Sequence, residues 1–266
     1  MLATHRLILA MMAGTSLLAA SGAANALQIR VTVENLAPSN GTLFTPVWVG
    51  IHDGSFDLFN PGEAASAELE RLAEDGNPGP LSSSFTGFGQ GIVFGPGLGA
   101  GTPPVFAPGA KSSIVIDFDP GEDTAYLSFA SMILPSNDAF FANADPRRFR
   151  IFDDGEFLSV RRVIFGSDIW DAGTEVNTAL AADTPLLGQS VPDTGLTEGG
   201  VVTAHAGFLP GGNILDAFPG ATIDQPNYRA ALITVSPVPE PPSWALMLAA
   251  FGVGGLARGF RKLRKS

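Results

Sequence analysis

Seven short runs rich in β-branched and aromatic residues, separated by turn-forming stretches, most constrain what this chain can fold into. The runs cover residues 27–35, 45–54, 112–119, 125–134, 147–153, 159–166 and 229–236. Strand-length runs bounded by glycine, proline, asparagine and aspartate are typical of antiparallel β-structure, whereas parallel sheets alternate strands with long helices. The pattern therefore predicts an antiparallel β-sandwich.

One segment has helical spacing instead. Apolar residues recur at helical intervals between residues 60 and 78, Asn60-Pro61 favours a helix start and Gly76 favours a stop. We expect this to be the only helix of the body. Residues 85–110 are rich in glycine and proline but contain no intact G-x-G-x-x-G or G-x-x-x-x-G-K-[ST] motif, so we expect a surface loop there.

Residues 1–26 have the three parts of a secretory signal peptide. His5 and Arg6 precede an apolar run that ends at Ala20, and the small residues of AANA (23–26) form a cleavage site. A short membrane anchor is the alternative, but a spanning helix needs roughly 20 apolar residues and this run is shorter. We expect cleavage before Leu27 and export of the remainder.

Residues 238–266 form a second targeting segment. Pro239-Glu240-Pro241 precedes an apolar run from Trp244 to Ala257, and basic residues follow from Arg258 onward. Because basic residues stay cytoplasmic, the body is expected to face outward. This segment closely resembles a PEP-CTERM sorting signal. The resemblance implies a Gram-negative bacterium, a transmembrane helix before processing, an exosortase-type sorting enzyme as a partner, and delivery to the cell surface, outer envelope or extracellular matrix.

The body between these two signals, residues 27–237, is strongly acidic. Of 26 acidic and 15 basic residues in the whole chain, one acidic and six basic residues fall in the signals, which leaves 25 acidic and 9 basic, or 9 − 25 = −16. This charge argues against nucleic acid as a partner. The body suits a single all-β domain in size. It has no cysteine, so an exported domain must rely on its core, with bound metal as a further option.

Carboxylates gather beside expected strand ends at three places, IDFDPGED (116–123), PSND (135–138) and SDIWDAGTE (167–175). Clustered carboxylates repel one another unless a cation lies between them, and calcium accepts roughly six to eight oxygen ligands in irregular geometry. Gly173 permits the tight turn that would bring Asp171 and Glu175 to one point. An acidic surface also contains carboxylate pairs by composition alone, so DFDPGED is equally readable as a solvated turn.

The order of these motifs resembles the spondin N-terminal (F-spondin) domain. The likeness spans nearly the whole body, through VENL (33–36), AEDG (73–76), SMILPSNDAFF (131–141), WDAGTEVN (170–177), HAG (205–207) and ALITV (231–235). The resemblance implies a C2-like antiparallel β-sandwich with one Ca²⁺ ion at an edge. It places metal ligands at Asp138, Asp171 and Glu175, with either Asp117 or Asp119 as a further ligand. Asp168 is expected to be an exposed acid at a strand end.

Signals of catalysis are weak in this sequence. The body has two histidines, His52 and His205, and neither G-x-S-x-G nor H-E-x-x-H occurs. We expect both histidines to serve packing or hydrogen bonding, and Phe140 and Phe141 to lie in the core. The leading hypothesis is a non-enzymatic, calcium-binding protein of adhesion or matrix association, with extracellular polysaccharide or surface proteins as partners. A glycosidase needs only two carboxylates, so the alternative is a matrix-modifying, carbohydrate-active enzyme that uses the acidic cluster.

Overall fold

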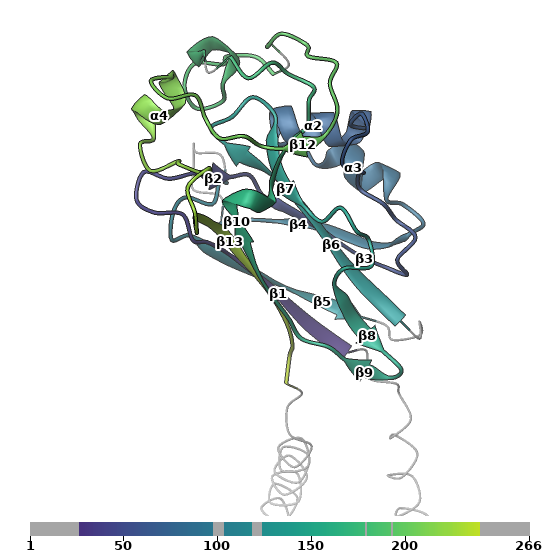
Figure 1. The fold of residues 1–266 in the computed structure, drawn as a ribbon. Coiled ribbons are helices and arrows are strands. Elements are labelled where there is room, and N and C mark those ends of the chain that lie inside the picture. The colour runs from purple at the N-terminus through teal and green to yellow at the C-terminus, as the bar shows by residue number, and fades with distance from the viewer. Residues whose placement is uncertain (1–26, 98–103, 119–123, 179, 193, 240–266) are drawn as a thin grey trace, which may run out of the picture.

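The computed structural model describes residues 27–97, 104–118, 124–178, 180–192 and 194–239, and these are mostly strands in antiparallel sheets (Figure 1). The predicted signal peptide and nearly all of the predicted sorting segment lie outside the described residues. Within the described ranges, no helix is long and apolar enough to cross a membrane.

The smaller sheet has four strands in the order β10 (Val160–Phe165), β13 (Arg229–Pro237), β1 (Leu27–Asn35) and β5 (Lys111–Phe118). All of its pairings are antiparallel. β1 alternates as a half-buried strand should, because Ile29, Val31 and Val33 are buried whereas Arg30 is exposed. This alternation fixes which face of the sheet turns toward the core.

The larger sheet has nine strands. Its main path is β12 (Thr203–Ala204), β11 (Ile169–Asp171), β7 (Ala139–Ala142), β6 (Thr124–Leu134), β3 (Val47–His52) and β4 (Gly89–Phe94). Three short strands extend it, of which β2 (Leu43–Phe44) and β8 (Arg150–Asp153) pair with β6, and β9 (Glu156–Phe157) pairs with β8. β6 is the longest strand, so it carries the chain from one end of the sheet to the other (Figure 1).

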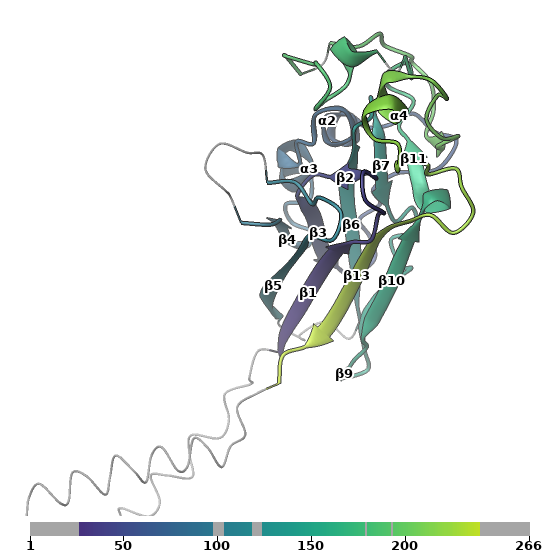
Figure 2. The same cartoon turned by 90° about the vertical axis from the view of Figure 1, so that its left-hand side faces the viewer.

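Both faces of the larger sheet are covered. Val47 and Val49 of β3 belong to the core shared with the smaller sheet, whereas Trp48 between them packs under the helices. Phe141 and Phe140 divide in the same way, and both are fully buried, which confirms that they are core residues. Figure 2 shows the two sheets face to face, with α2 (Ala67–Asp75) and α3 (Gly79–Ser84) outside the larger one.

The expected helix exists but begins later than predicted. Ser66 caps α2 by accepting a hydrogen bond from the Leu69 amide (3.3 Å), and Gly76 ends it in the left-handed conformation (φ 62°). The expectation of a single helix is wrong, because α3 follows directly and α4 (Asn213–Ala217) lies near the C-terminal end of the body.

The expectation that residues 85–110 form only a loop is also wrong. Residues 89–94 form β4, which pairs with β3 so that Gly91 lies opposite Gly50. A Cβ atom at Gly91 would lie 3.0 Å from the Phe85 ring, and one at Gly50 would lie 2.5 Å from the Trp48 ring. Glycine at these positions therefore leaves room for aromatic rings to lie against the sheet. Because glycine is unfavourable in strands, β-propensity did not predict this strand.

Candidate metal centre

The chain brings Asp138, Asp171 and Glu175 to the same end of the larger sheet. Asp138 immediately precedes β7, and Asp171 is the last residue of β11, where it lies opposite Ala139 in the strand register. Glu175 follows after a turn and forms an isolated bridge with Thr197. The predicted convergence of PSND with WDAGTE thus follows from the pairing of two short strands.

Asp138 holds the turn that leads to Glu175. Its Oδ2 accepts hydrogen bonds from the backbone amides of Thr174 (2.9 Å) and Glu175 (3.1 Å) and from the Thr174 hydroxyl (3.3 Å). Gly173 supplies the left-handed residue of the turn (φ 67°), and a Cβ there would lie 2.6 Å from the Val201 carbonyl oxygen. The side chain of Asp138 is completely buried, and its Oδ1 has no hydrogen-bond partner in the described part of the chain.

Asp171 closes the same turn from the other side. Its Oδ1 accepts the Gly173 amide (2.8 Å), and its Oδ2 accepts the side-chain amide of Asn177. Each carboxylate oxygen therefore has a protein partner but keeps a second lone pair.

Glu175 points into a closed space. The residue is 3 % exposed, and neither of its carboxylate oxygens has a partner at full hydrogen-bond geometry among the described residues, although the Gly195 amide and the Asn137 side-chain amide lie close enough to lower its pKa. The returning segment near Gly195 lies directly against the carboxylate, with no room for a Cβ. Glu74, a buried residue near the end of α2, is close enough to raise the pKa of Glu175 by charge repulsion.

Both buried carboxyls titrate far from their ordinary range. Burial, followed by repulsion from Asp171, raises the pKa of Asp138 to about 6 against the opposing effect of its hydrogen bonds. Burial is the largest cause that raises the pKa of Glu175 to about 7; repulsion from Glu74 and Asp138 adds to the rise, and hydrogen bonding from the Gly195 amide and the Asn137 side chain opposes it. The two groups are therefore costly to ionise without a nearby positive charge.

The donor set suits a hard cation. Asp138 Oδ1 and both Glu175 oxygens are buried and have no partner at full hydrogen-bond geometry in the part of the chain that the structure describes, and oxygen is the ligand atom that calcium prefers. Among the described residues, however, no three side chains of histidine, cysteine, aspartate or glutamate are grouped as a ready set of metal ligands. A bound ion would need further oxygens, from backbone carbonyls or water.

Asp117 lies apart from this cluster. It belongs to β5 of the smaller sheet, opposite Gln28 near the start of β1, and its Oδ1 accepts the Gln28 side-chain amide (2.8 Å). The eleven residues of β6 separate the DFDPGED turn from the PSND turn, which is roughly 35 Å of strand. The structure thus does not bring Asp117 to the other acids, and Asp119 lies outside the described residues.

Other sequence expectations meet mixed outcomes. Asp168 is half-buried, not exposed, because Arg162 donates a hydrogen bond to its Oδ1 (2.6 Å). His52 is buried and its Nε2 lies 2.9 Å from the Ser128 hydroxyl, while His205 accepts the Gly207 amide at Nδ1 (3.0 Å). Both histidines therefore make hydrogen bonds, as expected, although Nε2 of His205 is buried without a partner among the described residues.

Sequence reasoning did not single out Glu74 as a site residue. The AEDG motif marked the helix end, but only the packing of α2 shows that Glu74 is buried together with Leu72 and Ala73. A glutamate next to the apolar stripe of a helix was the available signal.

Two surface pockets lie elsewhere. One of about 620 Å³ is lined by residues that include His205, Asp224 and Tyr228. The other, of about 290 Å³, lies between β10 and the loop before β8. Neither is lined by Asp138, Asp171 or Glu175.

Comparison with known protein families finds no family model that matches this chain, and a search of the curated proteins finds no match. The spondin likeness therefore stays a resemblance carried by the motifs and their placement.

Proposed function

We propose that this protein is an exported, calcium-binding, spondin-type domain of C2-like sandwich architecture that acts without catalysis in adhesion or matrix association at the cell surface. The proposal combines the two targeting segments of the sequence with the buried carboxylates of the candidate metal centre.

One observation carries the calcium proposal. Asp138 and Glu175 present three buried carboxylate oxygens without a partner at full hydrogen-bond geometry among the described residues, and only the nearby Gly195 and Asn137 amides offset the charge of Glu175. An unpaired buried charge costs several kcal/mol, so such groups persist only where a cation or a proton neutralises them. In an acidic body without cysteine, a bound divalent ion also offers the stabilisation that disulfides give to other exported domains.

Asp138 and Glu175 would hold the ion, and Asp171 would keep their turn in shape. Asp138 already fixes the Thr174 and Glu175 amides through one oxygen, which leaves the other free to coordinate. Calcium supplies positive charge at this point and so restores both carboxyls to their ionised forms.

The same geometry supports a binding role over the glycosidase alternative. Catalytic carboxylates must reach a glycosidic bond, but Asp138 and Glu175 are buried and line neither of the two pockets. We therefore place calcium in a structural role and the partner at another part of the surface.

Thermal unfolding tests the metal proposal. Calcium should raise the Tm of the chelator-treated protein, because a ligand present at 100 times its Kd stabilises the folded state by about 2.7 kcal/mol. Asp138→Asn and Glu175→Gln should each abolish the rise. Asp117→Asn removes the carboxylate that lies apart and should retain it. If chelator and calcium leave the Tm of the unmodified protein unchanged, calcium is not a ligand.

A further inference from the structure

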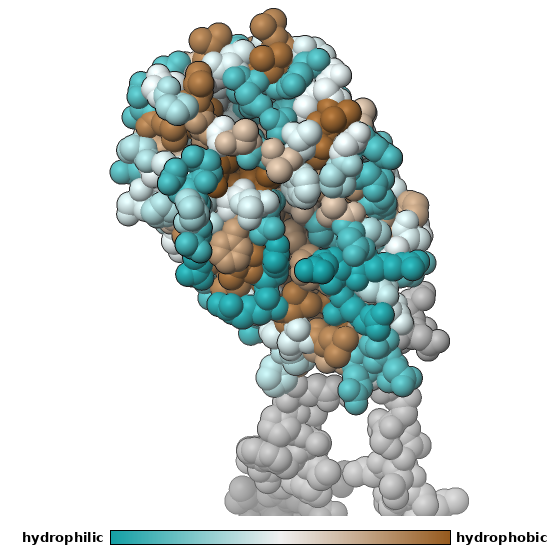
Figure 3. All heavy atoms as spheres, in the orientation of Figure 1, coloured by the Kyte–Doolittle hydropathy of each residue, from teal (hydrophilic) through white to brown (hydrophobic). Residues whose placement is uncertain are grey.

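The few basic residues of this acidic body are concentrated in one part of the chain. Of the nine lysines and arginines in residues 27–237, five are arginines within residues 147–162, at positions 147, 148, 150, 161 and 162. They lie on the loop before β8, on β8 and on β10. Figure 3 shows hydrophilic side chains gathered over the region that β6 and β8 occupy in Figure 1.

The pocket of about 290 Å³ lies among these elements. Phe129 of β6 contributes from the larger sheet, and Arg162 and Ile164 of β10 contribute from the outer strand of the smaller one. The pocket thus opens at the edge of the molecule where the two sheets part. Its volume falls at the lower end of the roughly 300–1,000 Å³ range of small-molecule sites, which suits a single ring.

Aromatic rings form the inner wall of this pocket. Phe149 lies beside Phe129, with ring centroids 5.4 Å apart, and Trp170 of β11 lines the same space. Phe149 and Trp170 are half-buried, and the Trp170 ring also packs against Phe59, with ring centroids 5.2 Å apart. Such rings offer flat apolar surface to the C–H face of a sugar.

Arg162 is held in place at the rim. It donates to Asp168 Oδ1 (2.6 Å), while Asp168 Oδ2 accepts the Phe165 amide (2.9 Å). Both oxygens of the Asp168 carboxylate therefore accept hydrogen bonds from the protein. A guanidinium has five N–H donors, so Arg162 keeps donors for a ligand hydroxyl.

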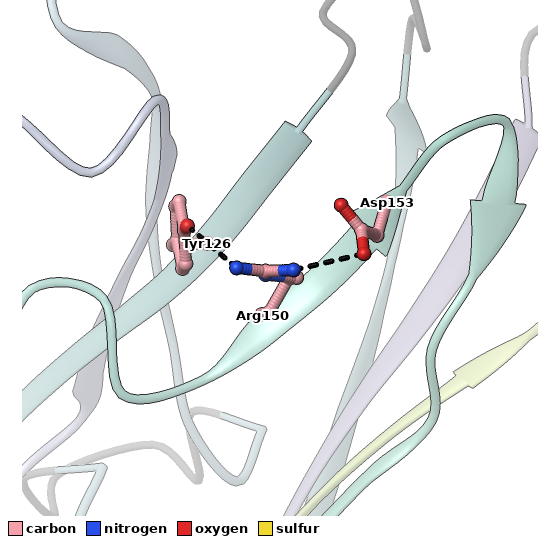
Figure 4. Close-up of polar contacts among 3 residues, drawn as sticks. All are labelled: Tyr126, Arg150 and Asp153. Atoms are coloured by element: carbon pink, nitrogen blue, oxygen red, sulfur yellow. Dashed lines mark hydrogen bonds and ion pairs between the residues drawn. The ribbon is translucent and has the colours of Figure 1, made fainter.

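Arg148 lines the pocket with a guanidinium that is available to a ligand. Its side chain is exposed and makes no ion pair or hydrogen bond with the described residues, whereas its backbone amide donates to the Asp145 carbonyl (3.1 Å). Arg150, two residues further along the chain, donates its hydrogen bonds to groups outside the pocket. Figure 4 shows its guanidinium between the Tyr126 hydroxyl (3.4 Å) and Asp153 (2.8 Å).

The loop that carries Arg148 is rigidly built. Asn143 is buried, its Oδ1 accepts the Phe129 amide (2.9 Å), and its Nδ2 donates to Ser128 Oγ (3.1 Å) and to the Asp145 carbonyl (3.0 Å). The Asp145 side chain in turn accepts the Arg147 amide (2.8 Å). Arg148 is thus presented from a fixed backbone beside the aromatic wall.

We propose that this pocket binds one carboxylate-bearing sugar residue of an extracellular polysaccharide. The ring lies against Trp170 and Phe149, the carboxylate pairs with Arg148, and a hydroxyl accepts a hydrogen bond from Arg162. Arginine suits this task because its planar fork matches a carboxylate in two parallel hydrogen bonds. The proposal rests on the matrix-associated function proposed above and supplies its partner and site.

Calorimetric titration with defined oligosaccharides tests the pocket. Trigalacturonate and trimannuronate serve as acidic probes, galactotriose as the neutral probe and free galacturonate as the monomer, all measured in EDTA. At least one acidic trimer should bind, and galactotriose should not bind detectably. Binding should also change the fluorescence of the protein, with the change lost in Trp170→Phe.

Two arginine variants give the matched comparison. Arg148→Gln should weaken binding about tenfold, a loss of about 1.4 kcal/mol. Arg161→Gln should bind as the unmodified protein does, because Arg161 points to the sheet face opposite to Arg162 on the same strand. Failure of both acidic trimers to bind, or equal effects of the two variants, overturns the proposal.

The EDTA in these titrations separates the two proposals. If calcium does not raise the Tm but the trimer still binds, only the metal proposal is contradicted. If calcium raises the Tm but neither acidic trimer binds, only the proposal for the pocket is contradicted.

Discussion

Gly195 lies against the carboxylate of Glu175, so closely that a Cβ atom at position 195 would stand 1.8 Å from Oε1. The segment around residue 195 returns beside the Asp171–Glu175 turn, where the Leu196 carbonyl accepts the Val176 amide (2.8 Å). The closed space around Glu175 thus depends on a residue without a side chain.

Gly195→Ala should therefore destabilise the protein by about 1–3 kcal/mol, because backbone or carboxylate must move to admit the methyl group. Urea unfolding measures the change. Gly97→Ala is the control, since nothing lies within 4 Å of a Cβ there, and it should stay within about 0.5 kcal/mol of the unmodified protein. Equal stability of the two variants would contradict the tight packing.

Stability should fall as pH rises when divalent cations are absent. The pKa of Glu175 is raised from 4.5 to about 7 and that of Asp138 from 3.8 to about 6. Between the ordinary and the raised values the folded protein holds protons that the unfolded chain has lost, so the free energy of unfolding decreases from about pH 4 to pH 7. Urea titrations in EDTA across this range should show a loss of up to about 6 kcal/mol, because each unit of pKa difference corresponds to about 1.4 kcal/mol.

Two variants check the origin of that slope. Glu175→Gln removes one titrating group and should flatten the pH dependence. Glu156→Gln alters an exposed residue of β9 and should keep the slope of the unmodified protein. A full slope in Glu175→Gln would assign it to other groups.

The two tyrosines of the chain should respond differently to loss of the hydroxyl. Tyr228 is buried, and its hydroxyl accepts the Thr42 amide (3.0 Å) and contacts the Thr42 hydroxyl (2.9 Å). Tyr228→Phe leaves a buried amide unpaired and should cost about 1–3 kcal/mol. Tyr126→Phe loses only the long contact to exposed Arg150 (3.4 Å) and should cost less than about 0.5 kcal/mol. Similar costs in urea unfolding would contradict this difference.

The glycine pair between β3 and β4 gives a further prediction. Gly50→Ala would place a methyl group 2.5 Å from Trp48 and 2.9 Å from Phe85, so it should destabilise the fold by about 1–3 kcal/mol and alter the near-ultraviolet circular dichroism of these rings. An unchanged spectrum with unchanged stability would show that the rings move aside freely.

Runs of β-branched and aromatic residues between turn-forming stretches made the long strands predictable from sequence. β1 covers the predicted residues 27–35, and β13 extends the predicted 229–236 by one residue. β4 escaped because its glycines serve ring packing, and β7 and β11 escaped as separate strands because each is only four residues or fewer. Pattern reasoning needs several periods of alternation, and such strands offer fewer than two.

The candidate metal centre was also predictable only in part from the sequence. Asp138, Asp171 and Glu175 converge because their motifs flank β7 and β11, which are neighbours in the sheet. The contribution of Glu74 depends on how α2 packs over that sheet, a long-range contact that local patterns do not encode. Asp117 was a candidate by its position before β6, but the length of β6 carries the chain away from it.

The pairing of Ile29 with Pro237 sets the two ends of the body side by side, at one end of the two central strands of the smaller sheet. The turns of the candidate metal centre lie at the opposite end of the molecule (Figure 1). A chain tethered at its C-terminal end would therefore hold the carboxylate turns roughly one β6 length, about 35 Å, from the point of attachment.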